Sequence, residues 1–381
     1  MPDRVPLELS AMGAVRPPAS AALAAAKRRE QQGFDAVWWA DHLLHWFPDS
    51  IWTPELVPQA AAQASPHVWF DPVPVIAAAA ATTRQVRLGI GVTDLVRNHP
   101  AALARTALTL DHLTGGRFLL GVGSGEALNL SPFGMANDRP LARLEEGLQV
   151  LRLLMSTTEP VDHDGDHFHL REASVGLAPA GEGPPPVWLA AHRPRGLRLV
   201  GRTADGWLPL ATDPDAYAAM LATVQGAAAG AGRDPDVVTP GLYARVVVAE
   251  TAEDALAAID GSLLLRFIAL TRPAEAYEAH GIDHPLGPGA FGLTTFQPTA
   301  LGREEALELA RAVPLPVLRD TVIHGTPDDV AATVLRFVER GARHVQITNM
   351  TPMADPTRAA TSESLLADTV AALRTGAPAA T

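Results

Sequence analysis

Length, composition and charge exclude several classes of protein. The chain has 381 residues, 47% of them hydrophobic and 19% charged, so it can bury a large core as two domains or as one α/β barrel. Its formal net charge of −12 argues against general nucleic-acid binding, and the absence of cysteine excludes disulfides, thiolate metal sites and cysteine nucleophiles.

Eight short runs rich in β-forming residues alternate with helical patterns along the chain. These runs span residues 5–13, 36–40, 85–93, 117–123, 186–191, 206–210, 242–250 and 344–350. Segments between them, such as 100–116 and 143–155, place apolar residues three and four positions apart, as amphipathic helices do. The alternation predicts a parallel sheet, and eight units favour a closed (β/α)8 TIM barrel that forms a single domain over residues 1–381.

The segment 326–342 carries the start signals of a helix. Thr326 can cap it, Pro327 takes the first helical position, and acidic residues occupy the first turn. We therefore expect a helix that begins at this threonine.

Three stretches are too long to be simple connections, and they follow the second, fourth and seventh predicted strands. Residues 41–71 are rich in Trp, Pro and His, residues 159–185 contain a predicted hairpin and a loop, and residues 282–321 carry many Gly and Pro. Insertions of this length usually form lids or binding loops.

The N-terminal sequence lacks the pattern of a secretory leader, and the longest nearly apolar stretch, residues 72–81, is too short for a membrane span. We therefore expect a cytoplasmic protein that does not insert into membranes.

Glycines and a carboxylate follow the fourth predicted strand, in the segment RFLLGVGSGEALNLSPFG at 117–134. A dinucleotide-binding loop requires G-x-G-x-x-G opening directly into a helix, but Glu126 occupies the third glycine position and a helix is expected only from about Asp138. In a barrel this loop lies at the catalytic end of the strands, where Glu126 would point into the mouth. A role for Glu126 as a helix cap is equally compatible with its position.

Asp41 and His42 follow the second predicted strand, at the same end of the barrel as Glu126. An adjacent acid and imidazole could orient a cofactor and transfer a proton. The alternative is a structural aspartate that caps the next segment beside a packed histidine, and these two residues taken alone favour that structural alternative.

Two histidine-rich segments are weak candidates for metal sites. In DHDGDHFHL, at 162–170, the DGD sequence favours a hairpin turn, and alternating residues beyond it would point to opposite faces. The spacing of His280 and His284 is interrupted by Gly281 and Pro285, which break a helix. We therefore expect no metal site.

Five segments resemble, in order, the bacterial luciferase-like superfamily, and they are most similar to its deazaflavin (coenzyme F420) branch. They are GFDAVWWADHLLHW (33–46), LGIGVTDLVRNHPA (88–101), RFLLGVGSGEALN (117–129), VWLAAHRPRGLRLVGRTADGW (187–207) and GTPDDVAATVLRFVERGARHV (325–345). Within that branch the phthiodiolone ketoreductases look closest. The resemblance implies a barrel with insertions, a small-molecule substrate and, usually, a homodimer.

The resemblance also implies roles for individual residues. It places Asp41 and His42 beside the deazaflavin ring, Trp46 on the substrate side of the ring, and Glu126 as a catalytic carboxylate. Whether His42 or Glu126 donates the proton stays open at this point.

Other residues are implied in cofactor binding. The loop after the fourth strand would contact the ring and its ribityl chain, backbone amides after the fifth strand would hold the phosphate, and a non-prolyl cis peptide bond after the third strand would support the back of the ring. The residues concerned are Ser124, Gly125 and Asn129 in the loop, Ala190, Ala191 and His192 at the phosphate, and Gly91 and Val92 at the cis bond. Candidates for the anionic tail of the cofactor are Arg193, Arg195, Arg198 and Arg202.

The expected function is an F420-dependent reductase that transfers a hydride between the deazaflavin and a largely apolar ketone, enone or imine, as in lipid or secondary-metabolite assembly. The only lysine, Lys27, lies in a helical pattern, and the late insertion carries no basic cluster, so a phosphorylated substrate is not expected. Apolar residues of the first insertion, Trp46, Phe47, Ile51 and Trp52, are expected near the opening. An FMN-dependent luciferase-like monooxygenase and a non-catalytic flavin-binding homologue remain alternatives.

Overall fold

Eight parallel strands form a closed ring in the computed structural model, which describes residues 7–376. Pairing of β8 with β9 and of β11 with β1 closes the ring. Its strands are β1 (Glu8–Met12), β2 (Ala36–Trp39), β3 (Arg87–Asp94), β4 (Phe118–Gly123), β7 (Val187–Leu189), β8 (Gly206–Trp207), β9 (Thr239–Val248) and β11 (His344–Asn349). The predicted (β/α)8 TIM barrel is confirmed, and each strand overlaps its predicted run.

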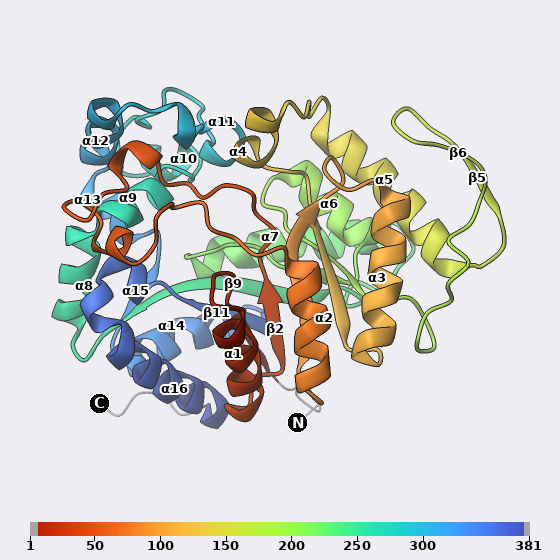
Figure 1. The fold of residues 1–381 in the computed structure, drawn as a ribbon, viewed down its shortest axis with the longest axis horizontal. Coiled ribbons are helices and arrows are strands. Elements are labelled where there is room, and N and C mark those ends of the chain that lie inside the picture. The colour runs from red at the N-terminus through yellow and green to blue at the C-terminus, as the bar shows by residue number, and fades with distance from the viewer. Residues whose placement is uncertain (1–6, 377–381) are drawn as a thin grey trace.

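Helices cover the outside of the ring, and α1, α2 and α3 lie side by side along one flank (Figure 1). The covering helices are α1 (Ala19–Gln31), α2 (Pro72–Thr82), α3 (Pro100–Thr114), α5 (Pro140–Ser156), α6 (Pro194–Thr203), α7 (Pro214–Gly230), α14 (Pro327–Glu339) and α16 (Ala359–Thr375). Strand residues such as Leu9, Val37 and Leu88 pack against them in the largest buried cluster. None of the described helices has the length and apolar character needed to cross a membrane.

The predicted start of α14 is confirmed. The Thr326 hydroxyl accepts a hydrogen bond from the backbone N–H of Asp329, and the Asp329 side chain accepts one from the N–H of Thr326. This reciprocal capping box satisfies two backbone donors that a helix start would otherwise leave free.

The interior of the barrel is filled by large side chains at its N-terminal end. Trp38 and Trp188 pack edge to face there, with ring centroids 5.4 Å apart. The buried His344 accepts a hydrogen bond from Trp38 Nε1 (3.0 Å) and contacts Glu8 Oε2 through Nδ1 (2.9 Å). Because this end is packed, ligands can enter only at the C-terminal ends of the strands, as is usual for such barrels.

The predicted insertions after the second, fourth and seventh barrel strands are all present. The first contains the 3-10 turns η1 (Asp49–Ile51) and η2 (Pro58–Ala61), and the second contains the predicted hairpin, β5 (Val161–Asp164) with β6 (His169–Ala173). The third contains α11 (Gly292–Thr295), η4 (Pro298–Ala300), α12 (Arg303–Ala312) and α13 (Leu315–Arg319). Further elements lie outside the predicted bounds. They are α4 (Ala127–Leu130) and η3 (Ser131–Phe133) directly after β4, and α8 (Ala252–Gly261), α9 (Leu263–Ala269), α10 (Glu275–Glu278) and β10 (Ile323–Gly325), so the insertion between β9 and α14 is longer than predicted. Short turns α15 (Thr351–Ala354) and η5 (Pro356–Arg358) lead into α16.

The first and third insertions pack on each other, and this corrects one expectation. Phe47, Ile51 and Trp52 were expected to add apolar surface at the opening, but they are 1%, 0% and 8% exposed. They form a second hydrophobic core with residues of α9 such as Phe267 and Ile268. Burial in this core removes their apolar surface from water, so they hold the insertions together instead of lining the mouth.

Candidate active site

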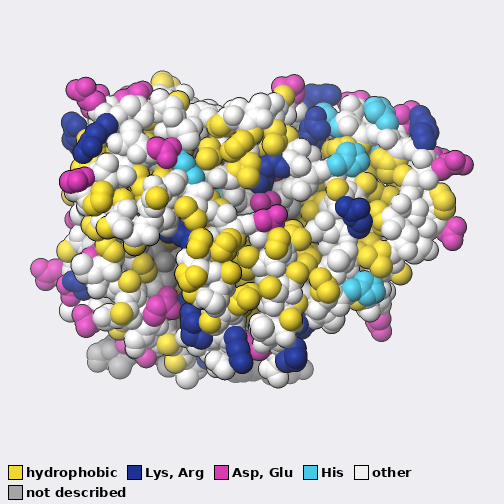
Figure 2. Space-filling model, in the orientation of Figure 1, with side chains coloured by type: hydrophobic (Ala, Val, Ile, Leu, Met, Phe, Trp, Pro, Cys, Tyr) yellow, Lys and Arg dark blue, Asp and Glu magenta, His cyan; other side chains and the backbone are white. Residues whose placement is uncertain are grey.

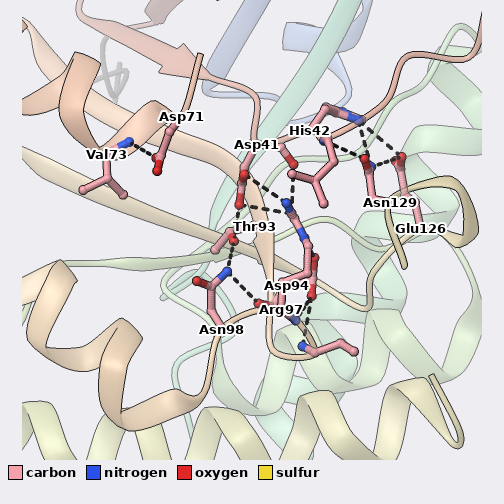
Figure 3. A network of polar contacts seen from close by, with 12 residues as sticks. Asp41, His42, Asp71, Val73, Thr93, Asp94, Arg97, Asn98, Glu126 and Asn129 are labelled. Carbon is pink, nitrogen blue, oxygen red and sulfur yellow. Dashed lines mark hydrogen bonds and ion pairs between the residues drawn. The ribbon is translucent and has the colours of Figure 1, made fainter. Parts of the chain in front are cut away.

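The loops that follow β2 and β4 bring His42 and Glu126 together at the C-terminal end of the barrel (Figure 3). His42 Nδ1 lies 3.7 Å from Glu126 Oε2. Asn129 joins the two side chains, because its Nδ2 lies 2.9 Å from His42 Nδ1 and 3.3 Å from Glu126 Oε2. Three residues predicted to share a site therefore form one hydrogen-bonded unit.

The amide of Asn129 also determines the tautomer of His42. Asn129 Oδ1 accepts hydrogen bonds from the backbone N–H groups of Leu43 (2.8 Å) and Leu44 (3.1 Å), which fixes the end of the amide that carries the oxygen. The NH2 group of Asn129 therefore donates to His42 Nδ1. A neutral His42 must then carry its proton on Nε2, which can act as a hydrogen-bond donor.

Burial keeps His42 neutral. It lowers the pKa of His42 to about 3, and the positive charges of Arg97 and Arg245 act in the same direction. Aromatic rings enclose the imidazole: Trp69 stacks on it with a centroid distance of 4.9 Å, and Trp46 meets it edge to face at 5.1 Å. His42 is therefore an uncharged donor held between two tryptophans at neutral pH.

Glu126 behaves in the opposite way. Burial raises its pKa to about 7, although the nearby Arg245 and Arg97 partly oppose the shift. Its carboxyl group therefore keeps a proton up to about neutral pH, and the contact with the neutral His42 is not an ion pair below that pH. Glu126 occupies the N-cap position of α4 but its side chain makes no capping hydrogen bond, so the capping alternative is wrong.

A glycine turn aims Glu126 into the mouth. Gly125 has φ +86°, a left-handed conformation that other residues adopt only with strain. A Cβ atom at this position would lie 2.8 Å from Leu130 Cδ1, so the Leu130 side chain would also have to move. The preceding Ser124 is anchored through its carbonyl, which accepts a hydrogen bond from Asn137 Nδ2 (3.0 Å).

The carboxylate of Asp41 is committed to an ion-pair network and does not act as a free acid. Arg97 donates from Nη1 and Nη2 to the two carboxylate oxygens of Asp41 at 3.1 and 3.0 Å, and Thr93 Oγ1 lies 2.5 Å from Oδ2. Arg97 is held in turn by Asp94 through Nε. These contacts, drawn in Figure 3, fix the loop that carries His42.

The positions implied in cofactor binding line the same mouth. The peptide bond between Gly91 and Val92 is cis, as the resemblance implies. Ala190, Ala191 and His192 follow β7, and no described residue accepts a hydrogen bond from the backbone N–H of Ala191 or His192. Burial lowers the pKa of His192 to about 4, and its Nε2 accepts a hydrogen bond from the N–H of Leu210 (2.9 Å).

Two of the four arginines expected near an anionic cofactor tail are engaged elsewhere. Arg193 pairs with Glu275 at 2.6 Å, and Arg202 pairs with Glu145 at 2.5 Å. Arg195 is exposed at the start of α6 and Arg198 one turn later, and the role of both at the cofactor tail stays a prediction.

Sequence reasoning missed Arg245 and Trp69. Arg245 lies on β9, is 5% exposed, and its Cζ is 5.5 Å from the ring centre of Trp46. The sequence signal for Arg245 is an arginine inside the apolar run LYARVVV. Charged residues are almost never fully buried unless they are paired, so an arginine in a buried strand indicates a binding role. Trp69, which stacks on His42, comes from the tryptophan-rich insertion after β2.

The histidines of the β5–β6 hairpin make local contacts. His163 pairs with Glu146 at 3.3 Å and His169 pairs with Asp164 at 2.9 Å. Within residues 7–376, no three acidic or histidine side chains are grouped so that they could hold a metal ion.

Comparison with known proteins places the chain in a family. Residues 1–344 match the family model described as luciferase-like monooxygenase. The chain is 34% identical over 341 residues to the phthiodiolone/phenolphthiodiolone dimycocerosates ketoreductase of Mycobacterium tuberculosis, with 87% of each chain covered. It is 27% identical over 321 residues to the 5,10-methylenetetrahydromethanopterin reductase of Methanolobus tindarius, covering 84% of this chain and 87% of the relative.

Solved structures share the fold. An F420-dependent secondary alcohol dehydrogenase in complex with an F420-acetone adduct superposes with a TM-score of 0.74 at 22% identity, covering 97% of this chain and 99% of that one. The family match spans most of the sequence, and the curated relative exceeds 30% identity over most of both chains. The protein is therefore a member of the luciferase-like family.

Proposed function

We propose that this protein is an F420-dependent reductase that transfers a hydride between the deazaflavin and a largely apolar ketone, enone or imine. The similarity to a named ketoreductase supports the reaction class. The observation that carries the proposal is the contact of Glu126 with His42 in the barrel mouth, bridged by Asn129, where burial raises the pKa of Glu126 to about 7 and lowers that of His42 to about 3. Reduction of a carbonyl group consumes one hydride and one proton, and Glu126 can supply the proton.

The residues of the mouth fit a deazaflavin. Ala191 and His192 offer two backbone N–H donors without an acceptor among residues 7–376, as a phosphate requires. Arg195 and Arg198, both exposed on α6, can neutralise an anionic tail. When bound, the deazaflavin supplies the hydride, while the protein orients it and provides the electrostatic environment.

The side chains of the mouth then have separate roles in the proposed mechanism. Glu126 donates the proton, because its pKa of about 7 makes it the acid present at neutral pH. His42 is neutral and donates a hydrogen bond from Nε2 to the reacting oxygen. Asn129 positions both groups, and Trp46, which contacts His42, would lie on the substrate side of a bound deazaflavin.

We also propose a homodimer. Figure 2 shows apolar side chains gathered near the middle of one face, where α2 lies. That helix has the sequence PVPVIAAAAAT, and Val73, Val75 and Ala77 are only partly buried. A second copy of the chain would cover this apolar surface, and light scattering of the purified protein measures the mass that decides it.

Anaerobic titration of the purified protein with reduced F420 and with reduced FMN tests the cofactor. We expect F420 to bind with a dissociation constant of about 1 μM to tens of μM and FMN to bind much more weakly. Micromolar binding of FMN without binding of F420 would instead favour the monooxygenase alternative.

Turnover, followed by deazaflavin absorbance, tests the substrate class. We expect reduction of apolar ketones or enones and no efficient F420-linked oxidation of glucose 6-phosphate, because the late insertion carries no basic cluster and the only lysine, Lys27, lies on α1. The Glu126→Gln variant should still bind F420 but lose turnover, and this separates a catalytic defect from a binding defect. Binding of F420 with no turnover by the unmodified protein would favour the non-catalytic alternative.

A further inference from the structure

The guanidinium group of Arg245 is a buried cation that no described residue neutralises. Tyr243, two residues earlier on β9, packs against the cluster inside the barrel, so Arg245 also faces inward but closer to the mouth. Its side chain forms no hydrogen bond and no ion pair with a described residue, and Nη1 is fully buried. A buried charge without a partner is costly, which points to an anion that arrives with a ligand.

The contrast with Arg97 shows that this arrangement is specific to Arg245. Arg97 lies in the same mouth but is saturated by Asp41 and Asp94. Arg245 is held only by aromatic rings, because its Cζ lies 5.5 Å from the ring centres of both Trp46 and Tyr243. Such contacts use the faces of the rings and leave the N–H donors of the guanidinium free.

Other polar atoms without partners surround this cation. Thr348 is the register partner of Arg245 on β11, and Gln346 is the partner of Tyr243. Thr348 Oγ1 and Gln346 Oε1 are both buried and make no hydrogen bond with described residues, and the same holds for Nε1 of Trp46. Trp46 contacts both Arg245 and His42, so its indole ring lies between the Arg245 guanidinium and the proposed proton-transfer site.

We propose that Arg245, with Thr348, binds a carboxylate group of the substrate. The proposal rests on the proposed function and refines its substrate class to a largely apolar carbonyl compound that carries one carboxylate. The planar fork of a guanidinium matches the two oxygens of a carboxylate, and one negative charge balances one cation. The hydroxyl of Thr348 can donate a further hydrogen bond to the same group.

A dianionic phosphate fits the site less well. Arg245 is the only cation of this group, since Thr348, Gln346 and Trp46 are all neutral. A second negative charge would stay uncompensated and would face the carboxyl group of Glu126, on which Arg245 already acts electrostatically.

Calorimetric titration with benzoate and with benzamide, its neutral counterpart of the same shape, tests the proposal without turnover. We expect benzoate to bind the unmodified protein at least about tenfold more tightly than benzamide, as charge-assisted hydrogen bonds imply. Arg245→Met should abolish this preference for benzoate, and Arg245→Lys should keep part of it. The control is Arg340→Met, which removes an exposed arginine paired with Asp215 and should leave the preference unchanged.

Several results would overturn the proposal. In the unmodified protein, these are equal binding of benzoate and benzamide, absence of benzoate binding, and tighter binding of inorganic phosphate than of benzoate. In Arg245→Met, it is a preference for benzoate that survives while the variant keeps its unfolding temperature. If Arg245→Met unfolds, Arg245→Lys decides, because a loss of about threefold or more in benzoate affinity is expected there from the weaker fork geometry.

F420 affinity separates this inference from the proposed function. Arg245→Met should bind oxidised F420 within about threefold of the unmodified protein, since the arginine is assigned to the substrate. A loss of F420 affinity of about tenfold or more would reassign Arg245 to the cofactor and overturn the inference. Failure of the unmodified protein to bind F420, with the benzoate preference intact, would overturn the proposed function and leave the carboxylate site standing.

Discussion

At the residue scale, the amide of Asn129 both holds the loop that carries His42 and contacts the two titratable groups, His42 and Glu126. In Asn129→Asp, an oxygen can still accept hydrogen bonds from the N–H groups of Leu43 and Leu44, but the donor that faces His42 and Glu126 is lost. A second carboxylate beside Glu126 should raise the pKa of Glu126 further and protonate His42. We expect turnover to fall by about 10²-fold, with F420 affinity changed by no more than about threefold. Steady-state rates and F420 titration measure the two effects, and unchanged turnover would show that Asn129 only holds the loop.

The pKa of Glu126 leads to a directional pH prediction. Burial raises this pKa to about 7, so the proton-donating form predominates below that pH and is lost as the pH rises through it. The rate of ketone reduction should therefore decline above about pH 7, measured as kcat between about pH 5.5 and 8.5. The decline should be absent in Glu126→Gln, whose rate should be lower by about 10²–10⁴-fold. The same decline in Glu126→Gln would assign it to another group.

Part of this site could be predicted from the sequence because of where residues fall on the strands. His42 and Glu126 each follow a barrel strand, and loops that follow parallel strands meet at one end of a barrel. Their opposite pKa shifts could not be predicted, because these depend on burial and on Arg245, which lies more than one hundred residues further along the chain. The tautomer of His42 likewise depends on how Asn129 is oriented by two backbone groups.

At the element scale, local signals predicted secondary structure better than they predicted packing. The capping box of α14 involves residues only three positions apart, so the segment beginning at Thr326 could be identified without knowing the rest of the fold. The burial of Phe47 and Trp52 could not, because their partners on α9 lie more than two hundred residues away in sequence. Apolar residues in an insertion indicate burial or a binding surface equally well, and only the tertiary structure distinguishes the two.

The cap of α14 gives a testable stability effect. Thr326→Ala removes the acceptor for the N–H of Asp329 and should lower the free energy of unfolding by about 1 kcal/mol. Thr326→Ser keeps a hydroxyl and should recover most of this loss. Urea denaturation measures both variants, and Thr223→Ala, at a half-buried position inside α7, is the control for loss of a threonine. Equal midpoints for Thr326→Ala and Thr326→Ser would contradict a role for the cap.

At the scale of the whole molecule, buried histidines set the response to acid. Burial lowers the pKa of six of them in the folded protein, and the shift is large at His42, His45 and His192. Burial also lowers the pKa of the other three, His284, His324 and His344. They stay neutral in the fold, whereas the unfolded chain takes up protons at histidine below about pH 6.5. Glu126 acts in the opposite direction, since its raised pKa favours the fold at low pH and loses that contribution as the pH rises through about 7.

Proton uptake by the unfolded chain should make the protein lose stability as the pH falls below about 6.5, by about 1 kcal/mol per pH unit for each histidine that stays neutral in the fold. Urea midpoints should therefore be highest near neutral pH and should fall steeply by about pH 5.5. His45→Phe should flatten this dependence, because a phenyl ring can keep the stacking on Phe47 but cannot take up a proton when the chain unfolds. His112→Asn, at an exposed histidine, should keep the steep dependence. A midpoint that stays constant between about pH 7.5 and 5.5 in the unmodified protein would show that these histidines are not held neutral by the fold.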